Sequence, residues 1–209
     1  MSNIIRKIAV AVAIAGSMFL GAQGASATAL DVGTTSGGGC CSFGTRGFWF
    51  EAPTDFTITG LSLPLESVQD STLEVVLFNS TPPTYTNTTN DFTSLGYWED
   101  VLSVETNLYF ETGDIIGILG WADGRTPYNN TGGDYASSLG GFSITLSRLG
   151  FQDLGMAYDL WTEDGTIGVI NVEYELGQVG DVDVSEPAQL ALLGFALVGF
   201  GLMRRRKTA

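Results

Sequence analysis

Residues 142–147 read Phe-Ser-Ile-Thr-Leu-Ser, and residues 170–176 read Ile-Asn-Val-Glu-Tyr-Glu-Leu. In both stretches apolar and polar side chains alternate residue by residue. Successive side chains of a β-strand point to opposite faces of the sheet, so the alternation predicts strands with one buried and one solvated face. These two stretches decide the fold class, because no comparable stretch has the periodicity of a helix.

Further stretches with strand character lie between residues 48 and 119. Two of them, 73–78 and 115–119, are almost continuously apolar, as is typical of central strands. In the stretch 56–63, Gly60 breaks the alternation, so a β-bulge is expected there. Seven to nine strands, at a spacing of roughly ten residues, predict an all-β fold with a single β-sandwich of jelly-roll type. The other strand candidates are 48–52 and 101–110.

Two segments have the composition of long loops. Residues 80–94 are rich in Thr, Asn and Pro, and residues 122–141 contain Asp-Gly, Asn-Asn and two Gly-Gly pairs. We place the sandwich domain, with a Gly-rich N-terminal segment, at residues 28–182, which is long enough for one sizeable core.

The charge is large, negative and unevenly distributed. The chain of 209 residues has 9 basic and 23 acidic residues and no histidine, for a net charge of −14. Between Thr28 and Ser185 there are 22 acidic residues and three arginines, for a net charge of −19. The lack of histidine excludes Ser-His-Asp and Cys-His catalysis and His-ligated metals. The negative charge argues against a nucleic-acid partner, because such binding depends on Lys and Arg.

Residues 1–27 are typical of a secretory signal peptide. Two basic residues precede an apolar run at 8–20, and Ala25 and Ala27 form an A-x-A cleavage site. We expect signal peptidase to cut after Ala27, with the overlapping residues 27–29 as the competing register. An uncleaved anchor is the alternative, although 13 apolar residues are few for a membrane span.

Residues 183–209 form a second membrane signal. The uncharged stretch 188–203 would make a helix of about 24 Å, somewhat shorter than the ~30 Å hydrocarbon core. Basic residues are retained on the cytoplasmic side, so the body is expected outside the inner membrane. The basic tail consists of Arg204, Arg205, Arg206 and Lys207.

Ser185, Glu186 and Pro187 stand directly before this apolar stretch. The proline favours an extended residue before it and a helix start after it, which exposes the tripeptide at the outer membrane surface. Tripeptide, apolar stretch and basic tail together resemble the PEP-CTERM sorting signal of secreted proteins in Gram-negative bacteria, with Ser185 in place of the first proline. The resemblance implies processing by exosortase, a membrane-embedded protease-transpeptidase, and association with the cell surface or the biofilm exopolysaccharide. An ordinary C-terminal anchor is the alternative.

The body is also similar to a module found in other PEP-CTERM proteins. The similarity covers residues 45–64, then 113–117 and 146–150. That module has no known function, so the similarity bears on fold and cellular context only.

Cys40 and Cys41 are adjacent. Neighbouring Cα atoms are ~3.8 Å apart, closer than the ~4.4–6.8 Å of an ordinary disulfide, so the pair could close only a strained vicinal ring. Intermolecular bridges and free thiols are the alternatives. Two thiols without histidine cannot complete a zinc site, and no metal site is predicted.

Trp121, Asp123 and Arg125 combine an apolar ring with hydrogen-bonding groups, which makes them a candidate glycan contact. Other rings could form sugar-stacking platforms. The alternative is that these rings fill the core or cover sheet edges. The additional rings are Tyr97, Trp98, Tyr128 and Trp161.

No cofactor and no catalytic residue is predicted. Carboxylates suit Ca²⁺, but neither an EF-hand nor a repeated Gly-Gly-x-Gly-x-Asp pattern is present, and residues 132–134 are only a fragment of the latter. Asp181 and Asp183 fit an acidic linker. Catalysis would have to rely on carboxylates alone, as in a glycosidase, so we expect a protein that is not an enzyme.

The sequence therefore predicts an exported, exosortase-sorted protein of the cell surface or biofilm matrix, with a structural or adhesive role. A carbohydrate-binding module for exopolysaccharide is the alternative, followed by a carboxylate-based polysaccharide-active enzyme. The expected partners are signal peptidase, exosortase, the inner membrane in the precursor, and exopolysaccharide.

Overall fold

The computed structural model describes residues 27–40, 44–65, 70–122, 124–129 and 131–177. These residues contain thirteen strands and no helix, so none of them forms a helix that could cross a membrane. The predicted signal peptide up to residue 26 and the predicted sorting segment from residue 183 lie outside the described residues.

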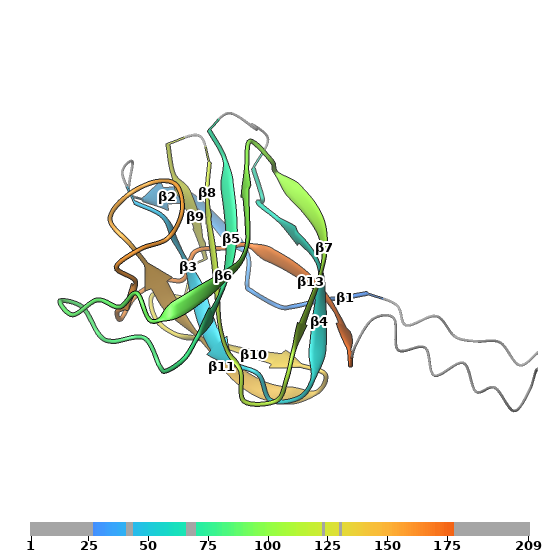
Figure 1. Cartoon of the computed structure of the whole chain (residues 1–209). Helices are drawn as coiled ribbons and strands as arrows, with labels where there is room; N and C mark the ends of the chain where they lie inside the picture. The colour runs from blue at the N-terminus through green and yellow to red at the C-terminus, as the bar shows by residue number, and fades with distance from the viewer. Residues whose placement is uncertain (1–26, 41–43, 66–69, 123, 130, 178–209) are drawn as a thin grey trace, which may run out of the picture.

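Eight strands build the sandwich. In chain order they are β1 (Thr28–Ala29), β3 (Arg46–Glu51), β4 (Phe56–Ser62), β5 (Thr72–Phe78), β6 (Phe92–Glu99), β7 (Ser103–Phe110), β8 (Ile115–Trp121) and β13 (Asn171–Leu176). One sheet has the order β1-β13-β4-β7, and the other contains β3-β8-β5-β6 (Figure 1). Counted from one to eight, these orders are 1-8-3-6 and 2-7-4-5, which is the strand order of a jelly roll. The predicted all-β jelly-roll sandwich is thus confirmed.

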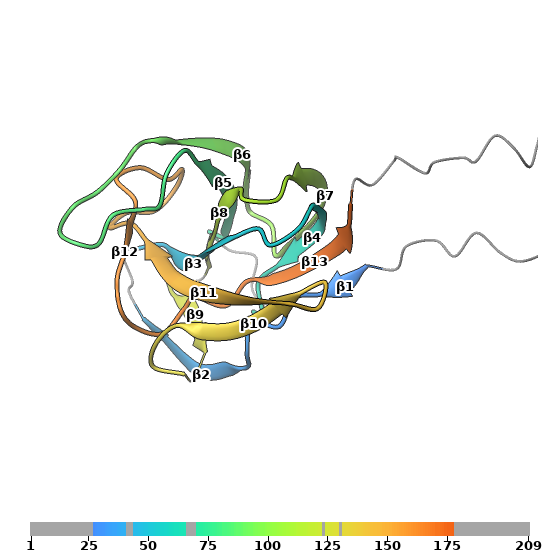
Figure 2. The same ribbon diagram turned by 90° about the horizontal axis from the view of Figure 1, so that it is seen from below.

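Five further strands are added to this frame. The hairpin β10 (Tyr135–Leu139) and β11 (Phe142–Gly150) extends the larger sheet beyond β3, and β12 (Trp161–Thr162) pairs with β11 (Figure 2). β2 (Thr35–Cys40) and β9 (Thr126–Asn129) form a separate two-stranded ribbon. The larger sheet therefore has the order β10-β11-β3-β8-β5-β6.

The main core lies between the two sheets. Phe50 of the larger sheet and Phe56 of the smaller one have ring centroids 6.1 Å apart, and Phe56 stacks on Phe110 at 5.3 Å. Tyr174 meets Phe56 edge-on at 6.2 Å. Burial of such rings is the largest favourable contribution to the stability of a sandwich, because each removes much apolar surface from water.

A second cluster covers the outer face of the larger sheet. It contains Val76, Leu119, Leu149 and Trp161, over which the segments 80–91 and 151–163 pass. Thr84 and Thr89 form bridges with Thr162 and Leu160, which hold the two segments together. Figures 1 and 2 both place these segments side by side. This added layer provides part of the pocket described below.

The structure confirms the seven predicted strands and the bulge at Gly60, where the register of β4 shifts against both neighbouring strands. The prediction of a long loop at residues 122–141 was wrong, because β9 and β10 lie there. β10 pairs with β11 through a two-residue turn at Gly140 and Gly141, both with positive φ. Such a Gly-Gly turn matches the twist of a hairpin, so this Gly-Gly pair is the sequence feature that indicates two paired strands here.

Candidate functional site

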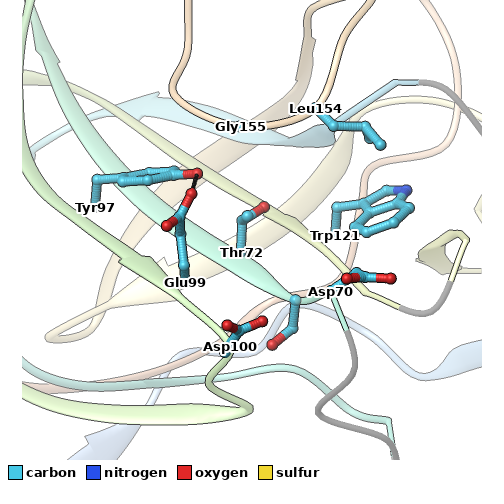
Figure 3. Close-up of a pocket in the computed structure, with 9 residues that line it drawn as sticks. Asp70, Thr72, Tyr97, Glu99, Asp100, Trp121, Leu154 and Gly155 are labelled. Carbon is cyan, nitrogen blue, oxygen red and sulfur yellow. Dashed lines mark hydrogen bonds between the residues drawn. The ribbon is translucent and has the colours of Figure 1, made fainter.

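A pocket of about 450 Å³ opens on the outer face of the larger sheet, where β5 begins and β6 and β8 end (Figure 3). Its volume is in the range of sites for small molecules. The lining residues are Asp70, Ser71, Thr72, Tyr97, Glu99, Asp100, Trp121, Leu154 and Gly155.

Strand register brings these side chains together. Thr72 of β5 lies opposite Glu99 on one side and opposite Trp121 on the other. Side chains alternate along a strand. Leu73 therefore points into the main core, whereas its neighbours Thr72 and Glu74 lie on the outer face of the sheet. Residues from three different strands thus meet in one row across the sheet.

The strand ends at the pocket are held by backbone and side-chain bonds. Asp100 N–H donates to the Ser71 carbonyl at 2.8 Å, and the buried Ser71 hydroxyl donates to the Val101 carbonyl at 2.7 Å. Asp70 and Asp100 both have left-handed φ values, 53° and 56°, which Asp tolerates better than most residues. Two carboxyl-bearing turns therefore lie side by side at the pocket rim.

The pocket is acidic. Asp70, Glu99 and Asp100 are exposed carboxylates, and the lining contains no lysine or arginine. Tyr97 donates its hydroxyl proton to Glu99 Oε1 at 2.7 Å (Figure 3). Burial, followed by this contact with Glu99, raises the pKa of Tyr97 above its usual value, so the phenol stays protonated near neutral pH.

Glu74 lies beside the pocket and connects it to the covering loop. The residue is only 2% exposed. Its carboxylate accepts hydrogen bonds from Ser94 Oγ and from Ala157 N–H, both at 2.7 Å. Burial raises the pKa of Glu74, and these two bonds act in the opposite direction. The bond to Ala157 attaches the loop that carries Leu154 and Gly155 to the sheet, so Glu74 positions one wall of the pocket.

The predicted glycan contact is only partly assembled. Trp121 lines the pocket and is 6% exposed. Its Nε1 has no hydrogen-bond partner among the described residues. Arg125 is exposed on the β8–β9 connection and does not line the pocket, and Asp123 lies outside the described residues. In place of Asp123 and Arg125, the pocket pairs Trp121 with Tyr97 and Glu99.

Most of the other aromatic candidates have packing roles. Trp98 packs against the main core. Trp161 is buried, with Tyr85 at 5.2 Å and the Arg46 guanidinium at 5.2 Å from its ring. Tyr128 lies under the Arg148 guanidinium at 5.1 Å. Of the five predicted rings, Tyr97 and Trp121 are the two that the structure brings into one pocket.

Several predicted sites receive no test from the described residues. Cys40 ends β2, but Cys41 lies outside the described residues, so the vicinal disulfide stays a prediction. Within the described ranges, no group of three carboxylate or cysteine side chains is placed to hold a metal ion. Ala27 is exposed directly before β1, whereas Ala25 lies outside the described residues.

Comparison with known proteins identifies the C-terminal segment. The sequence model of the PEP-CTERM protein-sorting motif matches residues 183–207, which include Ser185, Glu186, Pro187 and the basic tail. No curated protein and no solved structure matches the chain. The motif makes this chain an exported protein with a membrane-anchored precursor that exosortase processes.

Proposed function

We propose that the jelly-roll body has a structural or adhesive role at the surface, or in the biofilm matrix, of a Gram-negative bacterium. The observation that carries this proposal is the sorting motif at residues 183–207, attached to a single sandwich domain. Such a signal delivers its cargo to the outside of the cell, where the acidic, histidine-free body would act through contacts with other surface components.

The spacing between body and motif supports anchoring close to the membrane. β13 ends at Leu176, so six residues, 177–182, precede the matched motif. Six extended residues span at most about 20 Å. In the precursor, residues 188–203 would anchor the body as a membrane helix, and processing would then release it or transfer it to the surface.

The processing step can be followed with an epitope inserted between Gly132 and Gly133, in the connection between β9 and β10, where Gly132 is exposed. We expect a shortened, surface-exposed form in cells with exosortase and a full-length membrane form in cells without it. Pro187→Ala should accumulate the full-length form, whereas Asp181→Asn, outside the motif, should be processed normally. Full-length protein in both strains would contradict the proposal.

The role itself requires a second experiment. Cells that lack the chain should lose attachment or matrix cohesion, and the wild-type gene should restore it. A gene truncated before residue 183 should not restore it, because its product lacks the sorting segment. Restoration by the truncated gene would show that sorting is irrelevant to the role.

Carbohydrate binding is the second candidate, and the pocket favours it. Tyr97 and Trp121 provide two rings, and Thr72 and Glu99 provide hydrogen-bonding groups between them. Proteins bind sugars with this combination of apolar faces and fixed polar groups. We propose binding without turnover. The polysaccharide-active enzyme remains a third candidate that uses the same carboxylates, and release of new reducing ends would identify it.

A further inference from the structure

The charge of the pocket restricts its ligand. Three carboxylates, those of Asp70, Glu99 and Asp100, face a volume of about 450 Å³. The described arginines lie elsewhere: Arg46 is buried beneath Trp161, Arg148 pairs with Glu163 at 3.1 Å, and Arg125 is exposed outside the pocket. No cation of the described chain therefore neutralises the pocket, and a positively charged ligand would be attracted to it.

The hydrogen-bonding groups point to the same ligand. Glu99 already accepts the Tyr97 proton, so that hydroxyl has no proton left to donate. Within the described residues, no side chain donates to the carboxylates of Asp70 or Asp100. The pocket thus presents many acceptors and few donors. An ammonium group brings three donors and a positive charge, whereas a neutral hydroxyl brings one donor.

The aromatic walls favour a ring rather than a bare ion. Figure 3 shows Tyr97 and Trp121 at opposite ends of the pocket, with Thr72 between them. Trp121 lies in the wall with 6% of its surface exposed, and its Nε1 lacks a hydrogen-bond partner among the described residues. The Nε1 atom itself is buried, so this wall would contact a ligand through apolar ring surface, which suits both sugar carbons and cations.

We propose that this pocket binds a saccharide unit that carries a positively charged amine, as in a polymer of unacetylated glucosamine. This inference rests on the proposed carbohydrate binding by the pocket, and it specifies in addition that the bound sugar is positively charged. The amine lies among Asp70, Glu99 and Asp100, and the sugar ring lies between Tyr97 and Trp121. A divalent cation fits less well, because no described trio of carboxylates is spaced to ligate a metal.

The test compares two probes that differ only in acetylation. The processed protein is titrated calorimetrically at pH 6 with a β-1,4-linked glucosamine trimer and with its fully N-acetylated form. We expect at least ~10-fold tighter binding of the amine form, a difference that shrinks with added NaCl because the attraction is electrostatic. Calcium chloride in place of the sugar serves as a third probe.

Matched variants locate the site. Glu99→Gln and Asp100→Asn should each lower the affinity for the glucosamine trimer ~5–10-fold, as expected for the loss of a charge-assisted contact. Glu105→Gln removes another exposed carboxyl, on β7 of the other sheet, and should leave binding unchanged. Thermal unfolding of each variant confirms that the fold is retained, which is expected for exposed side chains.

The outcomes separate the two proposals. Equal affinity for both trimers would overturn the amine inference and leave carbohydrate binding standing. Absence of binding to either trimer, or to any exopolysaccharide fragment, would overturn both. Binding of Ca²⁺ that is lost in Glu99→Gln, with no heat from the amine trimer, would also overturn the inference. A weakening by Glu105→Gln as large as that by Glu99→Gln would place the ligand elsewhere.

Discussion

Two charged side chains, Arg46 and Glu74, are buried in the described part of the chain, and both are hydrogen-bonded to neutral partners, although Arg46 Nε has no partner among the described residues. Arg46 donates through Nη1 to the carbonyl oxygens of Thr45 and Phe151, and through Nη2 to Gln152 Oε1 at 2.8 Å. Glu74 accepts from a hydroxyl and an amide. A buried charge is costly unless it is hydrogen-bonded, so both residues make the fold sensitive to conservative substitution.

The substitution Glu74→Gln tests whether burial raises the pKa of Glu74. A carboxyl whose pKa is raised by folding binds more protons in the native than in the unfolded state, so its contribution to stability falls as pH rises from the unfolded to the folded pKa. The free energy of unfolding of the wild type, minus that of Glu74→Gln, should therefore decrease with pH above about 4.5 and then level off. Denaturant unfolding at half-unit steps between pH 4 and 8 measures this difference.

Glu105→Gln is the matched control for Glu74, because Glu105 is an exposed carboxyl. Its free energy of unfolding, measured over the same range, gives the effect of removing an exposed carboxyl. If the free energy of unfolding of the wild type minus that of Glu74→Gln were constant with pH, burial would not raise the pKa of Glu74.

Arg46→Lys should destabilise the fold although it keeps the charge. A lysine cannot reproduce the planar fork that reaches two carbonyls and Gln152 while lying 5.2 Å from the Trp161 ring. We expect a loss of about 2–4 kcal/mol in the free energy of unfolding. Arg125→Lys, at an exposed site, should change it by less than about 0.5 kcal/mol. Equal effects of the two substitutions would contradict the structural role of Arg46.

At the scale of elements, the hairpin β10–β11 depends on its turn. Gly141 has φ of 87° and open space where a Cβ would lie, so only backbone strain limits substitution there. Gly141→Asn should be tolerated, because Asn adopts the left-handed region, whereas Gly141→Val should cost about 1–2 kcal/mol. Thermal or denaturant unfolding of both variants measures the difference. If Asn and Val were equally destabilising, the positive φ would not be the cause.

The first strand bears on the signal-peptide cleavage site. Thr28 and Ala29 form β1 and pair with Tyr174 and Glu173, and Leu30 N–H donates to the Val172 carbonyl at 2.9 Å. Cleavage after Ala27 leaves this pairing complete, whereas cleavage after Ala29 removes β1. We therefore expect N-terminal sequencing of the processed protein to begin at Thr28. A sequence that begins at Leu30 would show that β1 is absent from the mature protein.

Local pattern predicted the longer strands but not the short additions. The stretches 142–147 and 170–176 have a clear period of two, and both form strands. β2 is a Gly-rich segment with no apolar face. Its partner strand β9 lies some ninety residues further along the chain. Strand formation of that kind depends on a distant partner, so local alternation carries no signal for it.

At the scale of the whole molecule, the acidic body is expected to need counter-ions wherever it meets an anionic surface. Between Thr28 and Ser185 the net charge is −19, and lysine is absent. Such a domain is soluble through self-repulsion and would contact an anionic matrix through divalent cations. Chelation with EDTA should therefore release the processed protein from the cell surface, and added Ca²⁺ or Mg²⁺ should restore retention.

The control for chelation is NaCl at the same ionic strength, which screens charges without removing bridging ions. It should release less protein than EDTA does. Retention that is insensitive to EDTA would refute cation bridging. Release by glucosamine trimer but not by its acetylated form would instead assign retention to the pocket around Glu99.

The sequence by itself determined where this protein goes and what kind of fold it has. Both depend on residues that are contiguous in the chain. The tripeptide that begins at Ser185, the apolar stretch and the basic tail specify sorting, and the period-two alternation specifies strands. The tertiary structure alone decided the candidate site. Thr72, Glu99 and Trp121 are far apart in the chain and meet only through the register of β5 with β6 and β8, beneath a loop that Glu74 attaches to the sheet. Register depends on pairing between distant strands, so no local pattern could reveal it.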